Sequence, residues 1–203
     1  MKNWLNLKYI QKNRSNILKK AYKLFKISKG KLYPLFVDTN TEIPIGEWIE
    51  AKEGEKVEGK NKVKSKIGPL CFRPGFHLSD IPLAIHIGEK DELGNIKYMH
   101  KDHVWCEVEY DDAFDYQTVA TLRGTNHATG KFNPKNAFLN YVPTKGYYRY
   151  KTSPNMLGEW IIAGNILVLR ILSDDEVAEI LKEKGYEPMP RKDGPIDLKK
   201  HGF

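Results

Sequence analysis

The sequence lacks the features of several specialised protein classes. Its two cysteines, Cys71 and Cys106, are too few and too far apart for a disulfide scaffold or a zinc ribbon. No apolar run approaches the roughly 20 residues of a membrane-spanning helix, and no secretory signal opens the chain. These absences predict a soluble protein of a reducing compartment, not secreted by a classical signal and without a transmembrane segment.

Acidic residues are missing from the first 37 positions, which carry ten basic ones. Residues 38–203 hold 23 basic and 26 acidic residues, so the net charge of +7 belongs to the start of the chain. Such asymmetry is typical of an appendage that meets a polyanion. We therefore expect residues 1–30 to form a basic arm that contacts nucleic acid or an acidic partner through Lys12, Arg14, Lys19, Lys20, Lys23 and Lys26.

Helical spacing relates Ile17, Ala21 and Leu24 within this arm, and Ser15 is a suitable N-cap. The pattern predicts an amphipathic helix over residues 16–27. Its apolar stripe either packs against the rest of the protein, leaving a solvated basic face, or meets nucleic acid, an anionic surface or another chain. A basic segment without acids also fits a transit peptide.

Residues 31–187 form the body of the protein. Their mixture of strand and helix patterns predicts an α+β fold with short mixed or antiparallel strands around a loop-rich centre. Apolar residues alternate with charged ones over 104–110, and apolar runs fill 159–163 and 166–172, so we expect strands there. Ser173 and Gly185 bracket a helix over about 174–184. Residues 80–84 favour a short helix, 120–146 a long loop, and 188–203 an extended tail.

Common catalytic motifs are not present. The Gly124–Lys131 segment has five residues between its glycines instead of the four of a phosphate loop, and Phe132 stands where a hydroxyl binds magnesium. His100 and His103 have no second ligand pair, which favours a surface loop over a metal site. We therefore expect no metal.

Two segments concentrate chemically useful side chains. In the first, Arg73, His77 and Ser79 surround a Pro-Gly kink. Arginine offers a fork for phosphate or carboxylate, histidine a stacking face and serine a hydroxyl. The alternative is a tight turn whose polar groups are satisfied locally.

The second segment, residues 146–160, ends with Glu159 at the head of an apolar strand. A carboxylate there can be aimed into a cleft to stabilise a developing cation or accept a proton, or it can simply lie in solvent. Arg149 and Tyr150, with Tyr147 nearby, could stack on nucleobases, although aromatic residues in strands usually belong to the core.

Across residues 31–185 the sequence resembles an uncharacterised domain family of bacteriophages and mobile elements. The resemblance rests on Leu32–Leu35, Arg73–His77, His86–Gly88, Val104–Trp105 and Tyr148–Met156. It implies a phage or mobile-element origin, and hence a location in the host cytoplasm or in the virion. It implies no particular activity.

A more distant resemblance links two segments to ADP-ribosyltransferases. Residues 75–84 are similar to that family's second motif, and 157–162 to its third, in which a glutamate begins an apolar strand. The resemblance implies NAD as substrate and Glu159 as the catalytic residue, with Arg73 on the pyrophosphate and His77 or Ser79 at the nicotinamide. The family's first motif carries His or Arg; the matching strand here offers only Tyr33, so Arg73 would take that role.

The expected function is therefore that of a phage or mobile-element protein with an ADP-ribosyltransferase-like core that uses NAD to modify a host macromolecule. The alternatives are a non-enzymatic module that binds nucleic acid or blocks a host protein, and a virion-associated structural protein that assembles through the helix at 16–27. The enzyme hypothesis requires Arg73, His77 and Glu159 to point into one cleft.

Overall fold

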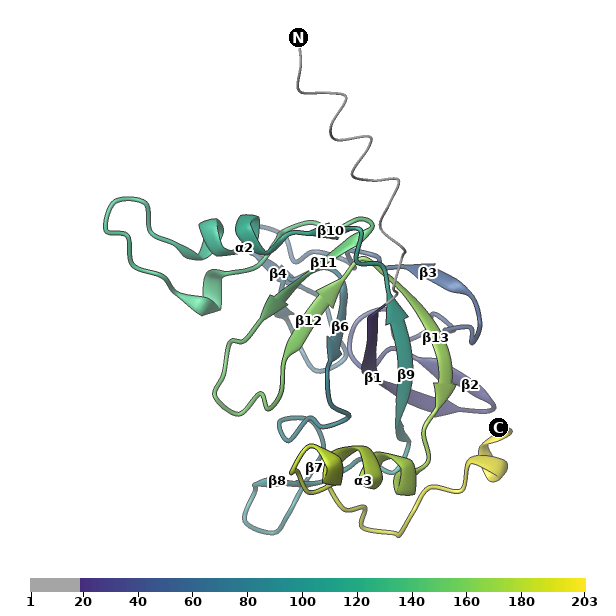
Figure 1. Ribbon diagram of the computed structural model, residues 1–203. Coiled ribbons are helices and arrows are strands. Elements are labelled where there is room, and N and C mark those ends of the chain that lie inside the picture. The colour runs from purple at the N-terminus through teal and green to yellow at the C-terminus, as the bar shows by residue number, and fades with distance from the viewer. Residues whose placement is uncertain (1–18) are drawn as a thin grey trace.

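A computed structural model describes residues 19–203, and its main feature is a mixed sheet of nine strands (Figure 1). The strand order is β10-β11-β12-β6-β1-β9-β13-β3, and β2 pairs with β1 beside this path. All pairings in this sheet are antiparallel except β10 with β11. Two further sheets have two strands each, β4-β5 and β7-β8.

Most of the strands are short. The strands are β1 (Lys19–Ser28), β2 (Lys31–Tyr33), β3 (Trp48–Glu50), β4 (Lys62–Val63), β5 (Leu70–Cys71), β6 (Phe76–Ser79), β7 (Glu89–Lys90), β8 (Ile96–Tyr98), β9 (His103–Tyr110), β10 (Phe114–Asp115), β11 (Gly146–Tyr150), β12 (Trp160–Ala163) and β13 (Asn165–Ile171). The helices are α2 (Gln117–Gly124), α3 (Asp174–Glu183) and two 3-10 turns, Pro134–Asn136 and Leu198–His201.

The expected α+β fold is wrong, because the described chain is mostly sheet and holds only two α-helices, of 8 and 10 residues. The helix predicted at 174–184 is confirmed as α3. Its Ser173 hydroxyl accepts from the Glu176 amide while the Glu176 carboxylate accepts from the Ser173 amide, which completes a capping box. The helix expected at 80–84 is also wrong, since that segment is irregular.

The amphipathic helix predicted at 16–27 is wrong for its described part, which is strand β1. The misleading pattern has a physical cause: both faces of β1 are covered, so apolar residues occur on both and no clean alternation appears. Leu24 belongs to one core cluster, whereas Phe25 and Ile27 belong to another. Residues 16–18 lie outside the described part.

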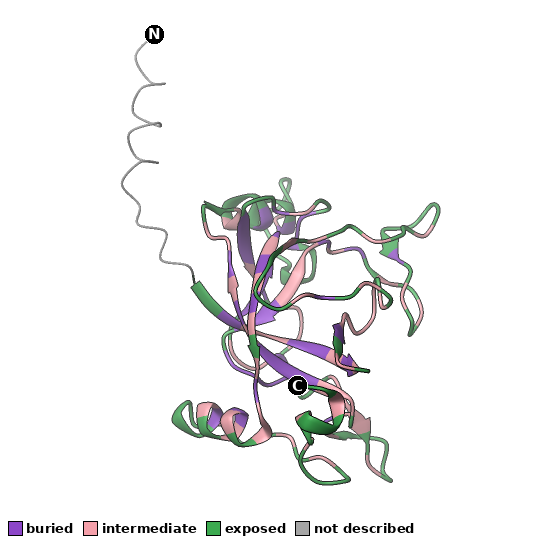
Figure 2. Ribbon diagram, turned by 90° about the vertical axis from the view of Figure 1, so that its right-hand side faces the viewer, coloured by how far each residue is buried: buried purple, intermediate pink, exposed green. Residues whose placement is uncertain are grey.

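Core side chains lie on both faces of the sheet, and much of its strands is coloured as buried in Figure 2. On one face, Trp105, Tyr148 and Trp160 pack with Leu181 of α3. On the other, Val108, Ile161 and Ile166 form a second cluster. Within residues 19–203, no helix is both long and apolar enough to cross a bilayer.

Candidate ligand-binding cavity

A cavity of about 890 Å³ opens where β1 and β6 separate. The two strands pair only at Tyr22 and Ser79, whereas β1 pairs with β9 over eight residues. Lys23 and Leu24, immediately beyond that single pair, line the cavity. The remaining wall residues come from the segment after β2, from β3 and β6, and from residues 63–73, 86–87, 105 and 150–160. Its volume is in the range of small-molecule sites.

Aromatic side chains form much of the wall. Trp105 and Trp160 are 4% and 5% exposed, while Trp48 on edge strand β3 is 44% exposed and lies at the rim. Tyr150 meets Trp160 edge to face, with ring centroids 6.4 Å apart. Phe36 and Phe76 add two more rings. The wall therefore suits a flat or apolar ligand body.

Neutral His77 is fixed in one tautomer by two hydrogen bonds. Its Nε2 lies 3.0 Å from the Arg73 carbonyl oxygen, which can only accept, so Nε2 carries the proton. Nδ1 then accepts from the Tyr150 hydroxyl at 2.9 Å. Burial lowers the pKa of His77 to about 4, so the imidazole is neutral at pH 7. His77 and Tyr150 therefore form an uncharged part of the cavity wall whose hydrogen bonds fix the orientation of both side chains.

Two cationic side chains of the cavity have no acidic partner among the described residues. The Lys23 ammonium donates to the His77 carbonyl oxygen at 3.2 Å, and burial lowers its pKa to about 8. Arg73 lies over the Phe138 ring, with its guanidinium carbon 5.1 Å from the centroid, and its Nε is buried without a hydrogen-bond partner. Uncompensated cations near apolar walls are costly unless an anion joins them.

The structure brings together only part of the site expected from sequence. Arg73, His77 and Tyr150 line the cavity, but Tyr33 and Ser79 do not. Ser79 is fully buried, and its hydroxyl accepts from the Ile81 amide at 3.4 Å.

Glu159 is exposed and is not part of the cavity wall. Its amide donates to the Asp80 carboxylate at 2.7 Å and its carbonyl accepts from the Asp80 amide, which fixes the turn before β12. Arg73, His77 and Glu159 therefore do not share one cleft, and the condition set by the transferase hypothesis is not met.

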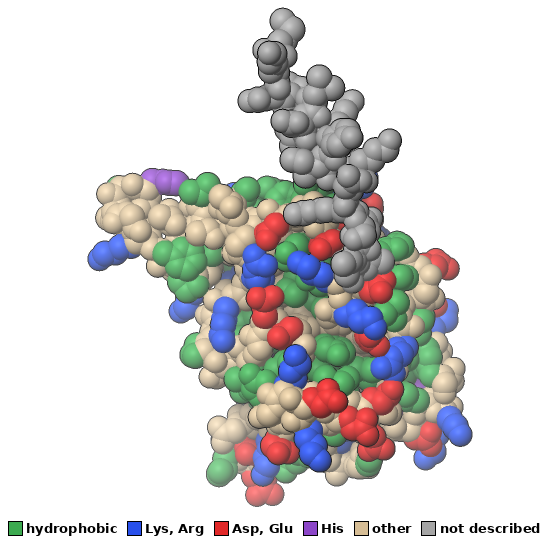
Figure 3. All heavy atoms as spheres, in the orientation of Figure 1, with side chains coloured by type: hydrophobic (Ala, Val, Ile, Leu, Met, Phe, Trp, Pro, Cys, Tyr) green, Lys and Arg blue, Asp and Glu red, His purple; other side chains and the backbone are tan. Residues whose placement is uncertain are grey.

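Most described lysines of the expected basic arm are engaged with acids. Lys20 pairs with Glu107 of β9 at 2.7 Å, and Lys26 contacts Asp102 at 3.5 Å. Lys19 donates to the Tyr147 hydroxyl and lies 3.7 Å from Asp112. In Figure 3, basic and acidic side chains are interspersed over the displayed face. Lys12 and Arg14 lie outside the described residues.

Arg149 and Tyr150 do not form the joint stacking surface expected from sequence. Because neighbouring residues of β11 point to opposite faces, Tyr150 enters the cavity while Arg149 pairs with Asp115 at 3.0 Å and lies over the Tyr147 ring.

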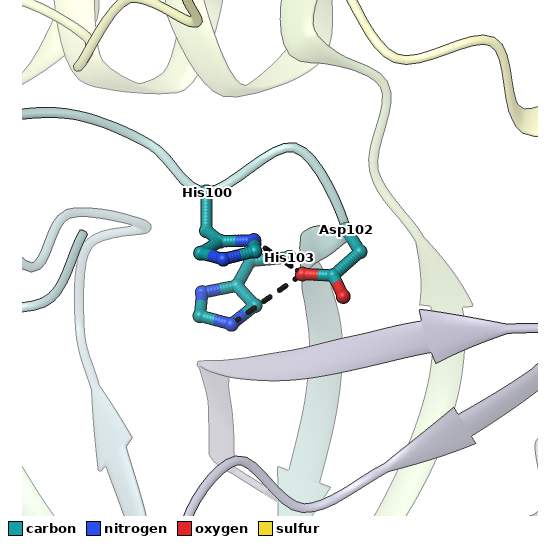
Figure 4. A group of neighbouring side chains, drawn as sticks. All are labelled: His100, Asp102 and His103. Carbon is teal, nitrogen blue, oxygen red and sulfur yellow. Dashed lines mark ion pairs between the residues drawn. The ribbon is translucent and has the colours of Figure 1, made fainter. Parts of the chain in front are cut away.

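A second polar cluster, His100, Asp102 and His103, lies at the start of β9 (Figure 4). One Asp102 oxygen lies 2.5 Å from His100 Nδ1 and 3.7 Å from His103 Nε2. The two rings stack at 24°, so their in-plane lone pairs run nearly parallel instead of converging. Joint metal ligation would require the rings to turn, and Lys26 and Arg191 add positive charge nearby.

Sequence reasoning did not identify Lys23 or the three tryptophans as residues of the cavity wall. The helix expected from the sequence places Lys23 among its surface lysines. The signal that could have identified it is strand alternation: Ala21, Lys23, Phe25 and Ile27 fall on one face, where a lysine among apolar residues is unusual.

No protein-family model, curated protein or solved structure matches this chain. The functional argument therefore rests on the cavity itself.

Proposed function

We propose that this chain is a small-molecule-binding protein whose cavity takes an organic anion with a flat, apolar body. The observation that supports this proposal is that Lys23 and Arg73 line an aromatic cavity and make no ion pair with a described residue, although Asp38, Glu42 and Glu50 also line it. A carboxylate or phosphate would pair directly with these two cations, and the tryptophan and tyrosine rings would contact the body of the ligand.

The test is calorimetric titration with 2-naphthoate and with its neutral counterpart, 2-naphthalenemethanol. We expect the anion to bind and the alcohol to bind at least about 10-fold more weakly, because a hydrogen bond to a charged group contributes about 1.5–3 kcal/mol. Arg73→Met should weaken 2-naphthoate binding about 10- to 100-fold. Arg149→Met is the matched control, because Arg149 does not line the cavity, and its affinity should not change.

Equal affinity for the anion and the alcohol, together with an unaffected Arg73→Met variant, would contradict anion recognition. Absence of binding by both compounds would contradict the assignment of the cavity as a site for this ligand class.

NAD belongs to the same chemical class, since it combines aromatic bases with a pyrophosphate, and Arg73 and His77 line the cavity. Binding of NAD is therefore a second candidate. The position of Glu159 outside the cavity wall gives no support to ADP-ribosyl transfer by that residue. Titration with NAD, followed by an assay of nicotinamide release, tests binding and turnover separately.

A further inference from the structure

Lys23 occupies an unusual position on a central strand. Toward β9 its register partner is Cys106, whereas toward β6 the single pair at Tyr22 and Ser79 has already ended and the β1–β2 pairing begins only at Lys26. Within the described sheet, Lys23 thus lies at a local split between strands. Its side chain spans this split, and its ammonium donates to the His77 carbonyl oxygen at 3.2 Å.

The surroundings of the Lys23 amine are apolar and hold no counter-ion. Its Nζ lies 5.2 Å from the Phe25 ring centroid and 5.6 Å from that of Phe76. Among the described residues, no carboxylate lies within the 4.0 Å of an ion pair with Lys23, although Asp38, Glu42 and Glu50 line the same cavity.

The titratable groups of β6 and β9, the strands beside Lys23, also provide no negative charge for its amine. Cys106 on β9 is buried, which raises the pKa of its thiol and keeps it neutral. His77 on β6 is neutral, and its pKa is lowered further by the charges of Lys23 and Arg73. With burial lowering the pKa of Lys23 to about 8, about a tenth of this amine is unprotonated at pH 7, far more than for an ordinary lysine.

We propose that Lys23 is a covalent anchor whose amine condenses with an aldehyde or ketone of the bound ligand to form an imine. The nitrogen lone pair attacks the carbonyl carbon, both amine protons pass to the carbonyl oxygen, and that oxygen leaves as water. Arg73, a wall residue of the same cavity, binds the carboxylate or phosphate of the same ligand and orients its carbonyl. The substrate class is an aromatic or apolar carbonyl compound that carries an anionic group. This inference rests on the proposed function.

The experiment uses 6-formyl-2-naphthoate as the probe and cyanoborohydride to reduce the imine to a stable secondary amine. Intact-mass and peptide mapping locate the adduct. At pH 7 we expect labelling at Lys23 roughly 10- to 100-fold faster than at an ordinary lysine, because its unprotonated fraction is larger. Labelling of Lys23 should rise with pH and level off above about 8; ordinary lysines should continue to rise toward 10.5.

Two variants separate chemistry from binding. Lys23→Arg keeps the positive charge but cannot form an imine, so it should lose the adduct and still bind 2-naphthoate. Lys20→Arg alters the exposed, ion-paired lysine of the same strand and should leave labelling of Lys23 unchanged.

The outcomes distinguish this inference from the proposed function. If 2-naphthoate binds but the aldehyde labels Lys23 no faster than Lys20, the covalent anchor is overturned and anion binding stands. If Lys23 is labelled rapidly although 2-naphthoate does not bind, the reactive amine is supported and the anion-recognition proposal fails.

Discussion

Lys23 should lower the stability of the fold, and its replacement by an apolar residue should raise that stability at neutral pH. Lysine has an ordinary pKa of 10.5, and burial lowers that of Lys23 to about 8. Each pKa unit corresponds to about 1.4 kcal/mol, so carrying the charge in the folded state costs about 3 kcal/mol at pH 7. Lys23→Met removes this cost but also loses the hydrogen bond to the His77 carbonyl, which contributes about 1 kcal/mol. The expected gain is therefore about 2 kcal/mol in the free energy of unfolding.

The pH dependence gives this prediction a second, independent measurement. Because the pKa is lower in the folded state, the unfolded chain binds more protons between pH 8 and 10.5. Wild-type stability therefore rises through that window, and the advantage of Lys23→Met should be largely gone by pH 10.5.

Urea unfolding of both proteins at pH 7 and pH 10.5 measures the two effects. Lys26→Met is the matched control on the same strand, since Lys26 is ion-paired with Asp102 near the surface, and should change stability by less than about 1 kcal/mol. A Lys23→Met variant that is less stable at pH 7, or whose gain is the same at both pH values, would refute the reasoning.

Three further predictions concern the scaffold, and each is read by urea unfolding. Gly75→Ala should lower the free energy of unfolding by at least about 2 kcal/mol, because Gly75 has φ +133° and an added Cβ would overlap Ile162 of β12. Gly94→Ala should lower it by about 1 kcal/mol, because Gly94 has φ +83° but open space around it. Arg191→Met should cost about 3 kcal/mol, since the buried guanidinium binds a carboxylate and two main-chain carbonyls, whereas Lys192→Met at an exposed ion pair should cost less than about 1 kcal/mol. Burial lowers the pKa of His103 to about 4, so the unfolded chain binds more protons between pH 6.5 and 4; wild-type stability should fall as the pH falls through that window, and His103→Gln should flatten the fall. Equal costs within either matched pair, or an unchanged acid slope in the histidine variant, would contradict the corresponding prediction.

Elements whose patterns are local could be predicted from sequence. The alternation at 104–110 predicts strand β9 correctly, because one face of the strand carries Glu107 and Glu109 while the other carries Val104, Cys106 and Val108. Helix α3 was equally clear, since its cap, acidic first turn and terminal glycine are all close in sequence. Neither inference depended on residues far along the chain.

Features that depend on distant partners could not be predicted in the same way. Strand β1 carries apolar residues on both faces and charges whose acidic partners lie some 80 residues later, so the segment alone indicated a basic helix. The cavity is equally non-local, because its lining residues come from segments as far apart as 23–24, 34–52, 63–77 and 150–160. Arg73 and His77 could be identified from sequence as candidate binding residues, but their partner in the cavity, Lys23, could not.

The pairing of β1 with β9 has a consequence for how the chain folds. Lys20 and Glu107 are 87 residues apart, yet they meet across the centre of the sheet. During synthesis, residues 19–28 emerge before β9 and cannot pair with it until it has been made, so contacts of large sequence separation must form before the sheet is complete. Repulsion between its lysines disfavours association of the unpaired segment with other copies of itself. Glu107 of β9, and Asp102 and Asp112 on either side of it, pair with these lysines only when that strand arrives, so the charges that disfavour self-association also favour pairing with the correct strand.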